Sequence, residues 1–246
     1  MIFMIVISEL LRVDNPWLTF SLMFMAAWAV IFISRPRVRR EMLVVSLLTM
    51  PFALSEPVFV PRYWSPPSLF NLAATTGFDI ESFIFCFAIG GIGSVLYEAL
   101  TGMVHKQGKA NPSPVANALH AAAILSPLIT FNALELLAGM NPIYSASISM
   151  LLAAVLSLIF RPDLVKETFA GGAVFTGMYF IFFLLFTALY PGIVERVWNL
   201  PALSGILVVG IPAEELMFAF CFGSLWSGAY ENVTGYRIRK TLSSGA

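Results

Sequence analysis

Seven stretches of this chain are apolar and long enough to cross a bilayer, and this feature constrains the fold most. A membrane-spanning helix needs about 20 apolar residues, because lipid offers no hydrogen-bond partners to an open backbone. Charged residues make up only 11% of the chain, against roughly 25% in a soluble domain. The sequence therefore predicts an all-α integral membrane protein. Its predicted spans are 17–34, 41–59, 80–98, 117–137, 142–160, 172–190 and 212–230.

Basic residues predict how these spans are oriented. With seven spans, eleven Lys and Arg residues fall on one side of the membrane and three on the other. Cytoplasmic loops carry the excess of positive charge, so we expect the N-terminus outside and the C-terminus in the cytoplasm of a multi-pass cell-membrane protein. Residues 1–13 are apolar but short, and we expect an interfacial or partly inserted helix there. The formal net charge is zero, so nothing indicates a nucleic-acid partner.

The chain also repeats itself. Around the third span of each copy the shift is 133 residues, and around the first and second spans it is 126. Each copy is one leading helix followed by three spans, and the leading helix is short in the first copy and spans the membrane in the second. Both copies therefore point the same way, as in a parallel duplication. Equivalent helices should then face each other across a central cleft, the default place for a ligand. The matched residues include Gly77 with Gly210, Glu81 with Glu214, Gly90 with Gly223, Glu98 with Glu231 and Asn15 with Asn141.

We predict four segments from this duplication. Residues 1–102 form the first repeat, and residues 117–235 form the second. Residues 103–116 are a cytoplasmic linker between them. Residues 236–246 are a basic cytoplasmic tail.

Glu81, Glu214 and Glu215 at the starts of the third spans are the candidate catalytic residues. Carboxylates are costly in a membrane, and a carboxylic acid that stays neutral there is a proton donor. The alternative is structural, because acids in a first helical turn are stabilised by the helix dipole. The first repeat has Ser82 where the second has Glu215, so only the first glutamate of the pair is repeated. Asp79 is the predicted N-cap of its helix.

Aromatic residues surround the acidic positions. Their ring faces can stabilise a carbocation by cation–π attraction, although aromatic residues at membrane interfaces and facing lipid are also common. The candidate substrate-binding residues are Tyr63, Trp64, Phe85, Trp198 and Phe218.

Two further patterns give structural expectations. Glu98 and Glu231 follow the candidate acids by 17 residues, or about 25 Å along a helix, so we expect them at the headgroup level of the opposite membrane face. The spacings Gly90-x-x-x-Ser94 and Gly223-x-x-x-Ser227 predict close contact between the third spans. The sequence contains no dinucleotide-binding or metal-ligand pattern, so we expect no cofactor and no metal.

The acidic helices resemble those of the integral-membrane lycopene cyclase domain family. The resemblance rests on Tyr63-Trp64, Gly77, the Glu81 helix, Trp198, Gly210 and the run from Pro212 to Phe218. That family is marked by P-x-E-E followed by aromatic residues in each half, and this chain diverges from it in its first repeat. The resemblance implies an isomerase that closes the linear ends of lycopene into rings without redox change, with Glu81, Glu214 and Glu215 as its acids and bases.

The partners implied are a carotenoid or other isoprenoid lipid, membrane lipids and either a second copy or other enzymes of the pathway. Two alternatives stay open at this point. One is a non-catalytic subunit that binds a carotenoid or lipid. The other is a small-solute transporter with parallel repeats, which should show a polar cavity near the membrane midplane.

Overall fold

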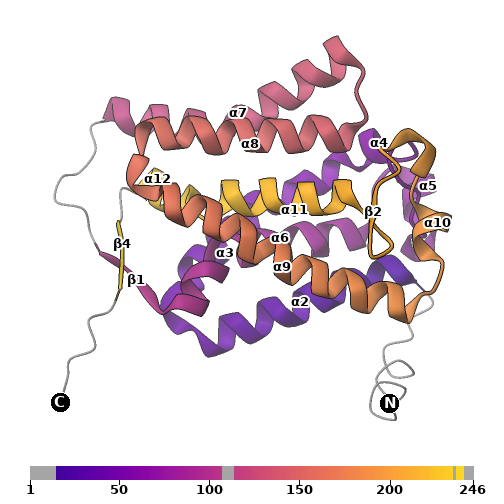
Figure 1. The fold of residues 1–246 in the computed structure, drawn as a ribbon, viewed down its shortest axis with the longest axis horizontal. Coiled ribbons are helices and arrows are strands. Elements are labelled where there is room, and N and C mark those ends of the chain that lie inside the picture. The colour runs from indigo at the N-terminus through magenta and orange to yellow at the C-terminus, as the bar shows by residue number, and fades with distance from the viewer. Residues whose placement is uncertain (1–14, 107–113, 235–236, 241–246) are drawn as a thin grey trace.

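The computed structural model describes residues 15–106, 114–234 and 237–240, and most of its helices run along one common direction (Figure 1). The first repeat contains α2 (Pro16–Ser34), α3 (Arg39–Thr49), α4 (Glu56–Phe59), α5 (Leu72–Thr76) and α6 (Ile80–Thr101). The second contains α7 (Pro114–Ala138), α8 (Pro142–Phe160), α9 (Val165–Leu189), α10 (Ile193–Val197), α11 (Ala213–Trp226) and α12 (Ala229–Thr234). Short 3-10 turns join them at Pro36–Val38, Met50–Ser55, Leu69–Asn71, Pro162–Leu164 and Leu200–Ala202.

Six of the described helical segments are long and apolar enough to cross a membrane, which confirms the predicted all-α membrane fold. They overlap the first six predicted spans, and α8 has the predicted bounds. α9 begins at Val165, seven residues before the start predicted for the sixth span. A single helix over 212–230 was predicted as the last span, and this is wrong. A turn at Ser227 and Gly228 divides it into α11, which has 14 residues, and α12.

Within residues 15–106, 114–234 and 237–240, four short strands form two antiparallel ribbons. β1 (Met103–Lys106) pairs with β4 (Arg237–Lys240), and β2 (Leu207–Val208) pairs with β3 (Ile211–Pro212). Figure 1 shows β1 and β4 at one end of the bundle and α4, α5 and α10 at the opposite end. The predicted linker and tail therefore meet in the first ribbon, which we did not predict. The helix expected over residues 1–13 lies outside the described residues.

The third span of each repeat packs against the first two spans of its own repeat: α6 against α2 and α3, and α11 against α8 and α9. Glycines permit this approach. A Cβ atom added at Gly90 would lie 1.8 Å from Thr49 Oγ1, and one at Gly223 would lie 2.7 Å from the Cβ of Phe175. These glycines thus face the second span of their own repeat, and the expectation that they join the third spans is wrong. The contact between α6 and α11 includes Gly93 and Phe222 instead.

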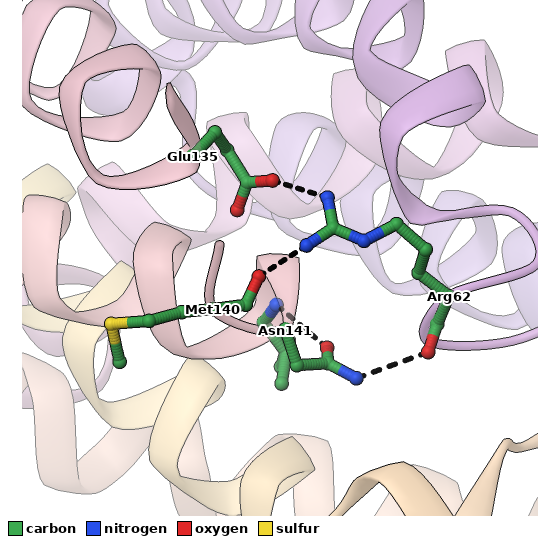
Figure 2. A network of polar contacts seen from close by, with 5 residues as sticks. Arg62, Glu135, Met140 and Asn141 are labelled. Atoms are coloured by element: carbon green, nitrogen blue, oxygen red, sulfur yellow. Dashed lines mark hydrogen bonds and ion pairs between the residues drawn. The ribbon is translucent and has the colours of Figure 1, made fainter. Parts of the chain in front are cut away.

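The loop after α4 is tied to the junction of α7 and α8 (Figure 2). The Arg62 guanidinium forms an ion pair with Glu135 and donates a hydrogen bond to the carbonyl of Met140. In the other direction, Asn141 Nδ2 donates to the Arg62 carbonyl over 3.0 Å. Asn199, from the loop after α10, donates to the same carbonyl over 3.1 Å. One backbone group therefore joins the loops of both repeats at this end of the bundle.

Candidate active site

A cavity of about 630 Å³ lies between the two repeats. Its wall is mostly apolar and comes from α2, the segment from α3 to α4, α6, α7, α8, α9 and α11. All five aromatic residues predicted to bind the substrate line it. Trp64 and Trp198 face each other across the repeats in an isolated antiparallel bridge, with ring centroids 5.6 Å apart. Trp17, Phe20 and Tyr179 also line the cavity, and sequence reasoning missed them.

Glu215 is the predicted catalytic residue that reaches this cavity. Its side chain is buried, and both carboxyl oxygens accept hydrogen bonds. Tyr63 OH and Trp198 Nε1 donate to Oε1, the latter over 2.7 Å, and Tyr179 OH donates to Oε2 over 2.5 Å. These donors come from the loop after α4, the loop after α10, and α9. Burial disfavours the ionised form of this carboxyl, and the three neutral donors oppose that effect.

The phenol of Tyr63 is suited to remain a donor. Burial, and then the negative charge of Glu215, hold the pKa of Tyr63 well above its usual value. The phenol therefore stays protonated when Glu215 is ionised. The loop that carries it is fixed at Arg62, the preceding residue, whose carbonyl accepts hydrogen bonds from Asn141 (Figure 2) and from Asn199.

Glu81 and Glu214 occupy equivalent positions in the repeats, and neither is among the residues that line the cavity. In the first repeat Glu81 Oε1 accepts from Leu69 N over 2.6 Å and from Asn15 Nδ2. In the second, Glu214 Oε1 accepts from Ser204 N over 2.7 Å and from Tyr144 OH over 2.6 Å.

Each of these carboxylates therefore ties the loop before its helix to the start of the first span in the same repeat. This shared structural role accounts for a glutamate at the same position of both repeats. Of the three predicted catalytic glutamates, the structure brings only Glu215 to the cavity wall. The N-cap prediction for Asp79 is confirmed, since its Oδ1 accepts from Ser82 N over 2.5 Å.

Glu56 is a cavity residue that sequence reasoning missed. It begins α4, it is 6% exposed, and its Oε2 accepts from Ser82 Oγ over 3.1 Å. Ser82 Oγ in turn accepts from Trp17 Nε1 over 3.3 Å. Among the described residues, Glu56 Oε1 has no hydrogen-bond partner. A carboxyl group within the apolar stretch 41–59 was the available signal, because ionisable residues inside spans are functional candidates by default.

A second set of acids lies away from the cavity. Glu41, Glu98 and Glu231 are buried, and each offers a ligand atom within 4.8 Å of the others. Glu98 lies in the last turn of α6 and Glu231 in α12, and both are buried beside Glu41. That the three acids meet was not predicted. Carboxylate oxygens at this spacing are of the kind that bind a hard cation. None of the three lines the cavity.

These observations describe a helical membrane protein whose two repeats enclose an apolar, aromatic cavity with carboxyl groups in its wall. The model of the lycopene cyclase family matches residues 15–100 and 141–233, which together are most of the chain. The chain therefore belongs to the lycopene cyclase family, as the resemblance of its acidic helices predicted. The two matched regions also confirm the internal repeat. No curated protein and no solved structure matches the chain.

Proposed function

We propose that this protein is an isomerase of the cell membrane that closes the linear end group of a carotenoid or related isoprenoid into a ring. The reaction is redox-neutral, because a proton is added at one carbon and another proton is removed nearby. The observation that carries this proposal is Glu215, a carboxyl group held by three donors in the wall of an apolar, aromatic cavity.

The cavity wall suits each stage of such a reaction. An apolar lining excludes water, which would otherwise capture a carbocation. The rings of Trp64, Phe85 and Phe218 present π faces that stabilise positive charge on the substrate. Glu215 then acts as the base that removes the final proton, with Tyr63 and Trp198 holding its carboxylate in place. In this proposal Glu81 and Glu214 are positioning residues, since they fix the two loops that carry part of the wall.

The apolar wall also favours ring closure over the transport of small polar solutes. A transporter of small polar solutes needs polar groups along its path, and this cavity is lined mainly by aliphatic and aromatic side chains. A polyene is long, apolar and lipid-soluble, and it matches the wall in chemistry.

Expression in a host that accumulates lycopene tests the proposal, with the pigments separated by chromatography. We expect cyclic products from the unaltered chain and loss of those products from the Glu215→Gln variant. Glu195→Gln is the matched control, because Glu195 is exposed and lies outside the cavity. Unchanged lycopene with all three proteins present in the membrane would contradict the proposal. Pigment that co-purifies without turnover would instead favour a non-catalytic binding subunit.

A further inference from the structure

We propose that Glu56 is a catalytic residue: it delivers the proton that starts ring closure, and Glu215 removes the proton that ends it. This inference rests on the proposed function and assigns a second acid to the same cavity. It also explains how a chain with a serine in place of the second glutamate of its first repeat can hold two catalytic carboxyl groups.

Two carboxyl groups are found among the described residues that line the cavity, and they come from different repeats. Glu56 belongs to the second span of the first repeat, and Glu215 belongs to the third span of the second repeat. Acid–base isomerisation needs one group that gives a proton and one that accepts a proton. A shared apolar cavity lets both groups reach one bound end group.

The hydrogen bonds around the two groups divide these roles. Glu215 receives donors on both oxygens, and these favour its ionised form against the effect of burial. Glu56 receives one hydroxyl donor on Oε2, and its Oε1 has no partner among the described residues. The titratable groups that act on Glu56 are Asp79 and Glu81, which are themselves acids. A buried carboxyl with so few donors is expected to keep its proton, and that proton can sit on Oε1.

Ser82 accounts for the divergence of the first repeat. It stands 133 residues before Glu215, at the equivalent point of its helix. Its hydroxyl accepts from Trp17 Nε1 and donates to Glu56 Oε2, so it orients the carboxyl of Glu56. In the second repeat this position carries a carboxyl group itself, in Glu215. In the first repeat the serine at this position instead orients a carboxyl group that comes from the neighbouring span.

The chemical steps balance with these two residues alone. The O–H bond of Glu56 breaks, and its proton forms a C–H bond with the terminal double bond of the polyene, which leaves a carbocation. A second double bond attacks that carbon, and the ring C–C bond forms. Glu215 takes a proton from the carbon next to the new cation, and the C–H electron pair becomes the ring double bond. After the product has left the cavity, Glu215 releases its proton to solvent and Glu56 takes one up, which restores the starting state.

A labelling experiment tests this assignment without turnover. Dicyclohexylcarbodiimide is an apolar reagent that modifies protonated carboxylic acids, and peptide mass spectrometry locates the adduct. We expect an adduct on Glu56 of the full-length protein in membranes, none on Glu215, and protection when lycopene is added. Folded protein without an adduct on Glu56, or with the adduct on Glu215 instead, would overturn the assignment.

Variants test the same assignment by turnover. We expect Glu56→Gln to lower ring formation by about 100-fold or more and Glu56→Asp to recover part of that loss. Glu195→Gln should keep the activity of the unaltered chain. Equal activity of Glu56→Gln and the unaltered chain would overturn the role of Glu56 while leaving the proposed function intact. An unaltered chain that forms no ring at all would overturn the proposed function, whatever the labelling shows. If Glu56→Gln does not fold, Glu56→Asp and the labelling pattern decide.

Discussion

The first turns of α6 and α11 are equivalent in sequence, yet they use their acids differently. At the first acidic position both repeats carry a glutamate, and both glutamates bind a loop N–H and a side chain at the start of the first span. At the next position the first repeat has Ser82 and the second has Glu215. That second position faces the cavity in both repeats. The glutamate found in both repeats thus fixes the loop before its helix. The next position, which differs between the repeats, is the one that a ligand in the cavity can reach.

This difference shows that a duplicated membrane protein can keep symmetric loops while its site becomes asymmetric. The second repeat surrounds its carboxyl with phenols and an indole. The first repeat brings in Glu56 from the neighbouring span and supports it through Ser82 and Trp17.

The phenols around Glu215 give the largest expected effect of these variants. Replacing Tyr63 and Tyr179 together with phenylalanine removes two hydrogen bonds to a charged group, each worth about 1.5–3 kcal/mol. We expect ring formation to fall by about 100-fold, with both single variants falling less. Pigment analysis per amount of folded protein measures this. Full activity in the double variant would show that ionised Glu215 does not depend on these donors.

Alanine substitutions at the helix glycines compare how closely the helices of each repeat pack. Gly90→Ala would place a Cβ atom within 2.6 Å of the Cβ of Thr49, and Gly223→Ala would place one 3.1 Å from the Gly172 backbone. We expect each variant to lose about 1–3 kcal/mol of stability. Thermal unfolding in detergent measures the loss. Gly177→Ala is the control, because an added Cβ there meets nothing within 4 Å. Equal melting temperatures for all three variants would contradict the packing described.

Ser82→Ala has the smallest expected effect. It removes the hydroxyl that donates to Glu56 but leaves both cavity carboxyl groups in place. A neutral hydrogen bond contributes about 0.5–1.5 kcal/mol, so we expect turnover to fall by no more than about 10-fold. The Glu215 side of the cavity should be unaffected, and mass spectrometry after carbodiimide treatment should still find no adduct on Glu215. Complete loss of activity in a folded Ser82→Ala protein would mean that Ser82 does more than orient Glu56.

Much of this fold is predictable from the sequence, because burial in lipid demands long apolar helices. The predicted span 142–160 matches α8, and the aromatic residues chosen around the acids all line the cavity. Which of Glu214 and Glu215 faces the cavity is not predictable in this way. Adjacent residues of a helix point about 100° apart, and the pattern does not say which direction holds the cavity.

Long-range contacts explain the other differences. Glu41, Glu98 and Glu231 are far apart in the sequence, and only the packed helix ends show that they meet. Leu69 and Ser204 bind their glutamates through backbone groups, which carry no sequence signal. Glu56 did leave a signal, because it is an acid within an apolar stretch. Its partner Ser82 identifies the site only after the loops have folded.

The most direct test of the account compares two neighbouring residues, Glu214→Gln and Glu215→Gln, in a host that accumulates lycopene. Ring formation is measured per amount of folded protein, together with the melting temperature of each variant in detergent. We predict that Glu215→Gln lowers ring formation by about 100-fold or more with little change in melting temperature. Glu214→Gln should keep most of the activity of the folded protein and melt at a lower temperature. The reverse pattern, with Glu214 needed for turnover and Glu215 needed only for stability, would contradict the account.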